Sequence, residues 1–171
     1  TDTYIEKEAT INEEIDRLRH AATQDLISRK DVVIVASVSC IYGVWDIKAY
    51  EDSIFQLRVW DEYQFDDLMK KLVLLQYKRA WEDFKPGTFQ VMWDLLEIFP
   101  SSQETVYSLE FWWNEISRIT RRNYLTWEIY EVLNEIEVFP AKHTVTTKDT
   151  INKILPQMQE ELKERLESFH A

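Results

Sequence analysis

The residue types that most often carry catalysis are few in this chain and widely separated. The three histidines are His20, His143 and His170, and Cys40 is the single cysteine. A metal site needs several such ligands at short spacing, and an internal disulfide needs a second cysteine. We therefore expect no metal centre and no disulfide, and the lone cysteine favours a reducing compartment such as the cytoplasm.

The stretch SVSC, residues 37–40, places two hydroxyls and a thiol directly after an apolar run. A hydrolase nucleophile usually lies on a sharp strand-to-helix turn within G-x-S-x-G, and no such pattern surrounds Ser39 or Cys40. No glycine-rich Walker loop occurs either. We interpret the chain as a binding or interaction module that is not itself an enzyme; a small hydrolase using Ser39 or Cys40 is the alternative.

Charge limits what the chain can bind. It has 20 Lys and Arg against 31 Asp and Glu, a formal net charge of −11. Sequence-independent nucleic-acid binding depends on basic surface, so any DNA contact must be local. The opening residues TDTYIEKEAT do not resemble a signal peptide, and no apolar run is long enough for a membrane span. We therefore expect a cytoplasmic protein with no membrane partner.

The first part of the chain reads as part of an α/β domain. A capping box at Thr10 and Glu13 and a 3.6-residue apolar period predict a helix over Thr10–Lys30. The β-branched run Val32–Val35 is typical of a buried parallel strand. A second helix is expected over Asp46–Leu57, with Asp46 as its N-cap.

The rest of the chain reads as an α+β module followed by a helix. A helix is predicted over Phe65–Tyr77, and from Gly87 the apolar period changes to two, which indicates an antiparallel sheet. The final helix is expected over Lys148–Phe169. The predicted strands are Thr88–Met92, Leu95–Phe99, Val106–Phe111, Glu115–Ile119, Ile129–Leu133 and Ile136–Phe139.

Two segments, Thr1–Thr23 and Asp31–Gly43, closely resemble the UvrB family of the bacterial UvrABC excision nuclease. The match continues in order through LQYKR, PGTFQV, EIFP, VFPAKHTVT and ELKERL, so it covers essentially the whole chain. The motifs SVSCIYG and TDTYIEK favour UvrB over the related UvrA-docking module of the transcription-repair coupling factor. A UvrA-docking module of the coupling factor is a second interpretation of the chain, and a redesigned scaffold without any partner is a third.

The resemblance implies a fragment with three parts. Residues 1–45 would end the DNA-gripping β-hairpin and supply part of a RecA-like helicase domain. Residues 46–145 would form the inserted antiparallel-sheet domain that docks on UvrA, and residues 146–171 would return to the ATPase body. The parent would bind ATP and Mg²⁺, verify damaged DNA in nucleotide excision repair and act with UvrC. The fragment itself would need no cofactor.

The same resemblance assigns candidate DNA contacts. Tyr4 matches an aromatic hairpin position that would stack on a base. Lys7 and Arg19 would contact phosphate, and Ser37 and Ser39 would do so from the loop after the strand.

Candidate UvrA-binding residues are Arg79, Gln90, Met92 and Glu110. The family often carries arginine where this chain has Gln90 and Met92, and Ser108 also stands where an arginine can occur. We therefore expect weaker docking on UvrA or docking through other contacts.

Glycine and tryptophan usage is unusual. The chain has 2 Gly and 7 Trp, although the average glycine content of ~7% would give about a dozen. The tryptophans at family glycine positions are Trp45, Trp60, Trp93, Trp113 and Trp127. We interpret these as glycines encoded by UGA, a codon that some genetic codes read as glycine and others as tryptophan; a deliberate Gly→Trp variant is the alternative.

Overall fold

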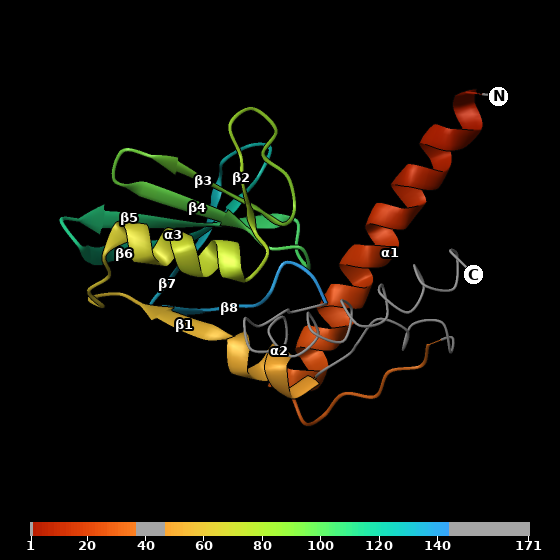
Figure 1. Ribbon diagram of the computed structural model, residues 1–171, viewed down its shortest axis with the longest axis horizontal. Coiled ribbons are helices and arrows are strands. Elements are labelled where there is room, and N and C mark those ends of the chain that lie inside the picture. The colour runs from red at the N-terminus through yellow and green to blue at the C-terminus, as the bar shows by residue number, and fades with distance from the viewer. Residues whose placement is uncertain (1, 37–46, 144–171) are drawn as a thin grey trace, which may run out of the picture.

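The computed structural model describes residues 2–36 and 47–143 of the chain. Three helices and eight strands occur in these ranges (Figure 1). The helices are α1 (Asp2–Ser28), α2 (Ile47–Ser53) and α3 (Phe65–Leu74). The strands are β1 (Phe55–Arg58), β2 (Lys78–Arg79), β3 (Thr88–Met92), β4 (Leu95–Phe99), β5 (Thr105–Trp112), β6 (Glu115–Asn123), β7 (Ile129–Leu133) and β8 (Glu135–Val138).

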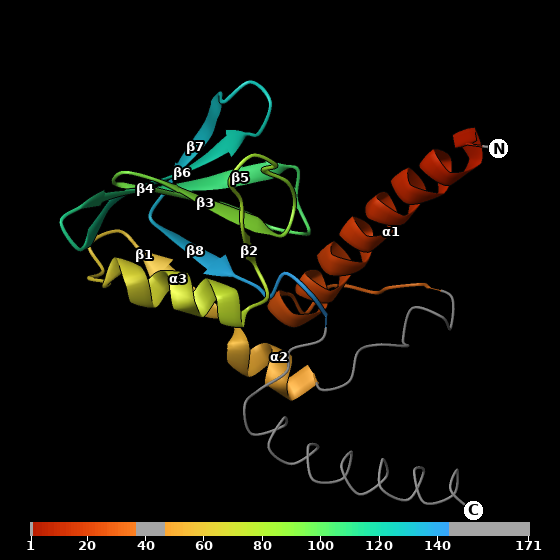
Figure 2. The same cartoon turned by 45° about the horizontal axis from the view of Figure 1, so that its top comes forward.

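The strands form two sheets. A six-stranded sheet has the order β2-β3-β4-β5-β6-β7, in which β2 runs parallel to β3 and the other neighbours are antiparallel. A two-stranded ribbon pairs β1 with β8. Figure 2 shows α3 and this ribbon lying along one face of the six-stranded sheet.

The hydrophobic core lies between that face and its cover. Apolar residues of α3, including Leu68 and Leu72, are fully buried against the sheet. The sheet contributes alternate residues such as Phe89, Leu96 and Leu109, because side chains two apart on a strand share a face. The intervening residues therefore point to the opposite face.

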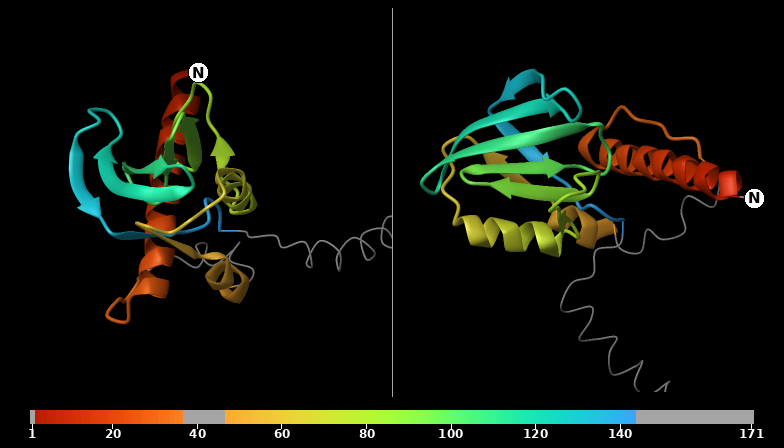
Figure 3. Two further views of the ribbon diagram at one scale, coloured as in Figure 1. Left: turned by 90° about the vertical axis from the view of Figure 1, so that its left-hand side faces the viewer. Right: turned by 90° about the horizontal axis from the view of Figure 1, so that it is seen from above.

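The six-stranded sheet is strongly curved (Figure 3). Its register shifts between Glu110 and Phe111 on β5 and between Arg121 and Arg122 on β6. Such bulges insert an extra residue, bend the strand and increase its twist.

The predicted antiparallel sheet is confirmed. β3, β4 and β7 have the predicted bounds, and β5, β6 and β8 differ from prediction by a few residues at their ends. Helix α3 begins at the predicted Phe65 and ends at Leu74, three residues early. Period-two patterning identified these strands because each one has a buried and a less buried face.

Several expectations for the N-terminal part are wrong in the described residues. Val32–Val35 is not a strand, and Val33 and Val35 are 90% and 95% exposed. A parallel strand needs neighbouring strands, and the described residues supply none for this segment. The end of a β-hairpin is also not seen, since α1 is helical from Asp2.

The helix expected over Asp46–Leu57 is a short helix followed by a strand. Helix α2 ends at Ser53, and β1 pairs with β8, a partner 77 or more residues away that no local pattern indicates. Strand β2 was not predicted, because two residues are too short to show a period. Asp46 and the helix expected over Lys148–Phe169 lie outside the described residues, and the RecA-like part stays a prediction.

Tryptophans occupy left-handed backbone positions in the turns. Trp60, Trp93, Trp113 and Trp127 have φ of 77°, 54°, 59° and 60°. An L-residue in this region costs ~1–2 kcal/mol relative to glycine. This confirms four of the five positions at which the sequence indicated a requirement for glycine; Trp45 lies outside the described residues.

Helix α1 contacts the sheet domain through its second half. The rings of His20 and His143 stack with centroids 3.9 Å apart. The Ser102 hydroxyl donates a hydrogen bond of 2.7 Å to Oε1 of Gln24. These contacts bury His20, which is 6% exposed, although the helix runs away from the domain over its first half (Figure 1).

A core truncation tests the packing. We expect Leu96→Ala to lower the free energy of unfolding by about 2–5 kcal/mol, because Leu96 is fully buried and its removal leaves a cavity. Leu125→Ala is the matched control, since Leu125 is 70% exposed and should change stability little. Urea denaturation measures both variants, and equal effects would contradict the assigned core.

A pH dependence is expected from the histidine stack. Burial, with a smaller contribution from His143, lowers the pKa of His20 from 6.5 to about 4. Burial of neutral His20 therefore carries no penalty above pH 6.5. As the pH falls from 6.5 toward 4, the free energy of unfolding decreases by up to roughly 3 kcal/mol, because the unfolded chain binds a proton that the folded one does not. Urea denaturation across this range measures it, and His20→Phe should flatten the dependence; an unchanged slope in that variant would contradict the assignment.

Candidate functional site

A row of polar residues crosses the face of the six-stranded sheet that points away from the core. In the strand register Gln90 pairs with Glu97, Glu97 with Ser108, and Ser108 with Thr120. Directly paired residues point to the same side of a sheet, so these four side chains share one face. We call this surface the polar face.

Glu97 lies at the centre of the row and is only 1% exposed. Its carboxylate accepts a hydrogen bond of 3.0 Å from the Ser108 hydroxyl at Oε1 and a short one from the Gln90 amide at Oε2. Both donors are neutral. Hydrogen bonds to a buried carboxylate offset part of its desolvation, so the two donors matter for the folding of this sheet.

A second row on the same face is charged and more exposed. The register aligns Met92 with Leu95, Leu95 with Glu110, and Glu110 with Arg118. Oε1 of Glu110 lies 3.8 Å from Nη1 of Arg118 and 3.5 Å from Nη2 of Arg122. The side chains of Glu110 and Arg118 are 40% and 45% exposed, so this cluster contributes little stability and remains accessible.

Arg122 is the more firmly held of the two cations. Its side chain is 19% exposed, and its Nε donates a hydrogen bond of 3.0 Å to the Thr120 hydroxyl. Thr120 itself is fully buried. Arg122 therefore connects the buried row of the polar face to the exposed Glu110.

Aromatic rings close one end of the polar face. Phe84, from the β2–β3 loop, contacts Phe99 of β4 with centroids 5.5 Å apart and stacks on Trp127 at 6.4 Å. Tyr124, from the β6–β7 turn, also contacts Phe99, with ring centroids 5.3 Å apart. These contacts bury Phe99 to 2% exposure and fix the end of the face.

The structure brings together three of the four residues predicted to bind a partner. Gln90, Met92 and Glu110 share the polar face, and Met92 is 46% exposed. Arg79 does not join them. It lies on edge strand β2 in register with the core residue Phe89, and its guanidinium is 4.5 Å from the Trp81 ring centroid.

The predicted DNA contacts lie elsewhere. Tyr4, Lys7 and Arg19 all belong to α1, with Lys7 and Arg19 roughly 18 Å apart along the helix axis. Arg19 also lies 3.4 Å from Asp16. Ser37 and Ser39 are outside the described residues.

The residues that the sequence reasoning missed are Glu97, Arg118, Thr120 and Arg122. The signal was present in the period of two along EISRITRRN, which places residues 118, 120 and 122 on one face. A polar residue within the apolar run LLEIF likewise marks Glu97.

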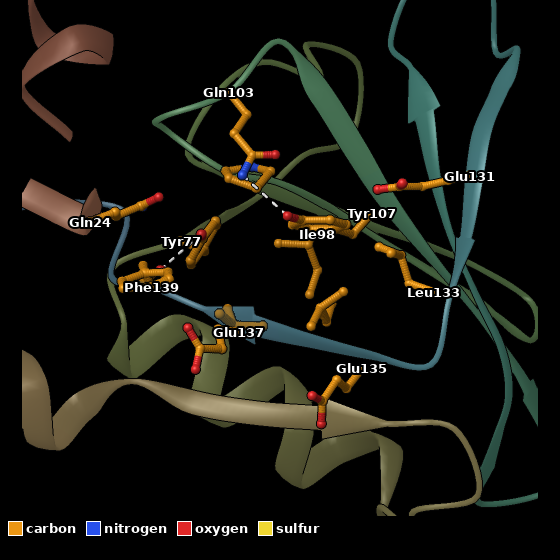
Figure 4. A pocket seen from close by; sticks show the side chains of 13 residues that line it. Gln24, Tyr77, Ile98, Gln103, Tyr107, Glu131, Leu133, Glu135, Glu137 and Phe139 are labelled. Atoms are coloured by element: carbon orange, nitrogen blue, oxygen red, sulfur yellow. Dashed lines mark hydrogen bonds between the residues drawn. The ribbon is translucent and has the colours of Figure 1, made fainter. Parts of the chain in front are cut away.

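A cavity of about 280 Å³ lies on the opposite side, between the sheet and β8 (Figure 4). The Tyr77 hydroxyl donates to the Phe139 carbonyl at 2.9 Å, and the Gln103 amide donates to the Tyr107 hydroxyl at 3.1 Å. Three glutamates line it, and each already has a partner: Arg121 for Glu131, Arg58 for Glu135 and Gln56 for Glu137. The three carboxylates that line the cavity are therefore already engaged.

Within residues 2–36 and 47–143, no three His, Cys, Asp or Glu side chains are grouped as metal ligands would be. Across the same ranges, no helix combines the length and apolarity needed to cross a membrane. The exposed row of the polar face, which carries the fixed charges of Glu110 and Arg118, is the arrangement suited to binding another macromolecule.

Comparison with known proteins matches residues 55–144 to the model of the UvrB interaction domain. The chain is 48% identical over 168 residues to UvrABC system protein B of Natranaerobius thermophilus. It is 45% identical over 172 residues to the protein of that name from Staphylococcus saprophyticus and 47% over 170 residues to that from Chloroflexus aggregans. The matches cover 98% to 100% of this chain but only 26% of each relative, so the chain spans about a quarter of their length.

Truncation of Glu97 tests the buried row. We expect Glu97→Ala to lower the free energy of unfolding by about 1–3 kcal/mol, because the Gln90 and Ser108 donors lose their acceptor inside the protein. Glu97→Gln keeps the shape and one acceptor oxygen and should cost less. Urea denaturation compares the two, and a larger loss for Glu97→Gln would contradict the hydrogen-bonded role.

Proposed function

Because the chain belongs to the family of the UvrB interaction domain, we propose that it docks on UvrA as part of a UvrB subunit in nucleotide excision repair. The observation that carries the proposal is the placement of Gln90, Met92 and Glu110 on one sheet face. Three of the four residues that the family resemblance assigned to docking therefore share one face, and Arg79 lies apart from them. This supports the polar face as the docking surface.

The physical properties of the polar face suit a specific protein partner. Exposed Met92 and its paired neighbour Leu95 offer apolar contact beside the charges of Glu110 and Arg118. Charges at such a surface increase the association rate and exclude partners of the wrong charge, while a few central contacts supply most of the affinity. A sheet face that is backed by a packed core also needs little rearrangement on binding, which limits the entropic cost.

The missing arginines have a substitute on the polar face. Positions 90, 92 and 108 carry Gln, Met and Ser, but β6 brings Arg118 and Arg122 to the same face beside Glu110. We include both in the proposed docking surface, where they supply the guanidinium groups that bind carboxylates well. Arg79 would act from the edge strand as a peripheral contact.

The remaining functions belong to the longer protein that the relatives represent. In it, we propose that Tyr4, Lys7, Arg19, Ser37 and Ser39 contact damaged DNA. ATP and Mg²⁺ would be bound by an ATPase body to which residues 1–45 contribute part of a RecA-like domain, and UvrC would act on the resulting complex. Residues 1–171 alone would not hydrolyse ATP, and the cytoplasm is the proposed location.

Two alternatives are weaker. A docking module of a transcription-repair coupling factor would also bind UvrA, but the similarity to UvrABC system protein B extends over 98% of this chain. A hydrolase using Ser39 or Cys40, which lie outside the described residues, finds no support in the comparisons. An electrophilic probe that labels neither residue would remove it.

Titration of this chain into purified UvrA tests the proposal. We expect Glu110→Arg to weaken binding tenfold or more, because it removes the shared carboxylate and leaves three cations together. Glu62→Arg is the matched control, since Glu62 is exposed and lies outside the polar face. Calorimetry gives the Kd, and circular dichroism verifies folding of both variants.

If the unsubstituted chain binds UvrA and Glu110→Arg binds it equally well, the docking surface lies elsewhere. No binding by the unsubstituted chain, when circular dichroism shows that the chain is folded, would contradict the proposed function.

A further inference from the structure

The tryptophans of this chain fall into two groups by backbone conformation. In the described ranges, the positive-φ residues other than glycine are Trp60, Trp93, Trp113, Trp127 and Gln76. Trp81 and Trp112 are described too and are not among them. Four tryptophans thus share a conformation that L side chains rarely adopt.

Each of these four occupies the glycine position of a recognisable turn. Asp61 N–H bonds to the Arg58 carbonyl at 3.1 Å, so Trp60 is the third residue of a four-residue turn. Its φ of 77° is that of a type II turn, which requires a positive φ there and usually takes glycine.

The two tight hairpins show the same substitution in a different turn. Met92 pairs with Leu95 and Trp112 with Glu115, leaving two central residues in each turn. In both turns the first central residue, Trp93 or Trp113, has the positive φ. This sign pattern is that of the type II′ turn, whose first central residue is glycine.

Trp127 ends the longer β6–β7 turn. Its N–H bonds to the Asn123 carbonyl at 3.0 Å, and the Asn123 N–H bonds to the Glu128 carbonyl at 2.9 Å. A left-handed residue just before the strand resumes is the usual position of glycine in longer hairpin loops.

Packing does not explain the large side chains. Trp93 and Trp113 are 93% and 88% exposed, and Trp60 is 72% exposed. These rings gain little burial that would offset the backbone strain. Trp127 is 41% exposed and stacks on Phe84, but it occupies the same left-handed region.

Gln76 shows what an ordinary exception looks like. It follows α3, where its N–H bonds to the Val73 carbonyl and the Tyr77 N–H bonds to the Leu72 carbonyl, both at 3.0 Å. This is the Schellman helix ending, in which residues other than glycine occur at the left-handed position. The positive φ of Gln76 therefore has a capping role that the four tryptophans lack.

We infer that the codons of Trp60, Trp93, Trp113 and Trp127 are UGA and that the cell of origin reads UGA as glycine. The protein made in that cell then has glycine in all four turns. Trp81 and Trp112, which have no positive φ, are encoded by UGG and remain tryptophan. The exposed rings at the four turns are accordingly not a base-stacking or partner-binding surface.

The gene sequence is the first test. UGA at positions 60, 93, 113 and 127, together with UGG at 81 and 112, is the expected result. UGG at any of the four, or UGA at 81 or 112, overturns the inference. Mass spectrometry of the protein isolated from its own cells gives the second readout. Peptides that span the four turns should have the masses calculated with glycine, not tryptophan, at these positions.

Stability gives a third readout that does not depend on the gene or on UvrA. We expect the chain with Trp→Gly at all four positions to have a midpoint temperature higher by roughly 15 °C or more than the tryptophan chain. The matched control, Trp81→Gly with Trp112→Gly, should leave the midpoint unchanged or lower it. A lower midpoint in the fourfold variant, or an equal rise in the control, overturns the argument from positive φ. If the tryptophan chain does not fold and the fourfold glycine variant does, the inference is supported.

Discussion

The register of β3, β4, β5 and β6 is the constraint on which both faces of the domain depend. With Gln90 opposite Glu97 and Glu97 opposite Ser108, the residues that alternate with them, such as Phe89, Leu96 and Leu109, face α3 and the β1–β8 ribbon. A shift of one residue in any of these strands would exchange the two sets. Two-residue turns hold the register of β3 with β4 and of β5 with β6, which is why their backbone conformation matters far from the turns themselves.

Glu97 shows how the register links stability to surface chemistry. The buried carboxylate is satisfied by neutral groups from both neighbouring strands, so it ties β3, β4 and β5 together without a salt bridge to either donor. On β6, Thr120 lies opposite Ser108, and Arg122 hydrogen-bonds both Thr120 and Glu110. The charged part of the polar face is thereby positioned by groups that are themselves buried.

The elements that could be predicted from sequence were those whose pattern is local. β3, β4 and β7 were placed correctly because alternation and tight turns mark them, and α3 because its apolar stripe is regular. β1 escaped prediction because its partner is distant in sequence, and β2 because it is two residues long. Val32–Val35 reads as a buried strand by composition, but burial needs neighbouring strands that the described residues do not provide.

The candidate site was predictable in part for the same reason. The family resemblance named Gln90, Met92 and Glu110 as candidates. The alternation along one strand places Gln90 and Met92 on the same face, but that Glu110 lies on this face too follows only from the order of the strands in the sheet. Only the parallel pairing of β2 with β3, which aligns Arg79 with the core residue Phe89, shows that Arg79 does not belong to the polar face. The alternation along β6 puts Arg122 on the polar face and Arg121 on the other, but only the pairing of β6 with β5 and β7 shows that Arg122 meets Glu110 and Arg121 meets Glu131.

Strand β7 has a consequence for how the chain behaves at high concentration. It is the last strand of the six-stranded sheet, and Ile129, Tyr130 and Val132 on it are 43%, 53% and 60% exposed. An open edge that carries β-branched and aromatic side chains is a template for pairing with the same edge of another molecule. Glu128 directly precedes these residues, so repulsion between the Glu128 carboxylates of two molecules opposes that pairing, and added salt would weaken the protection.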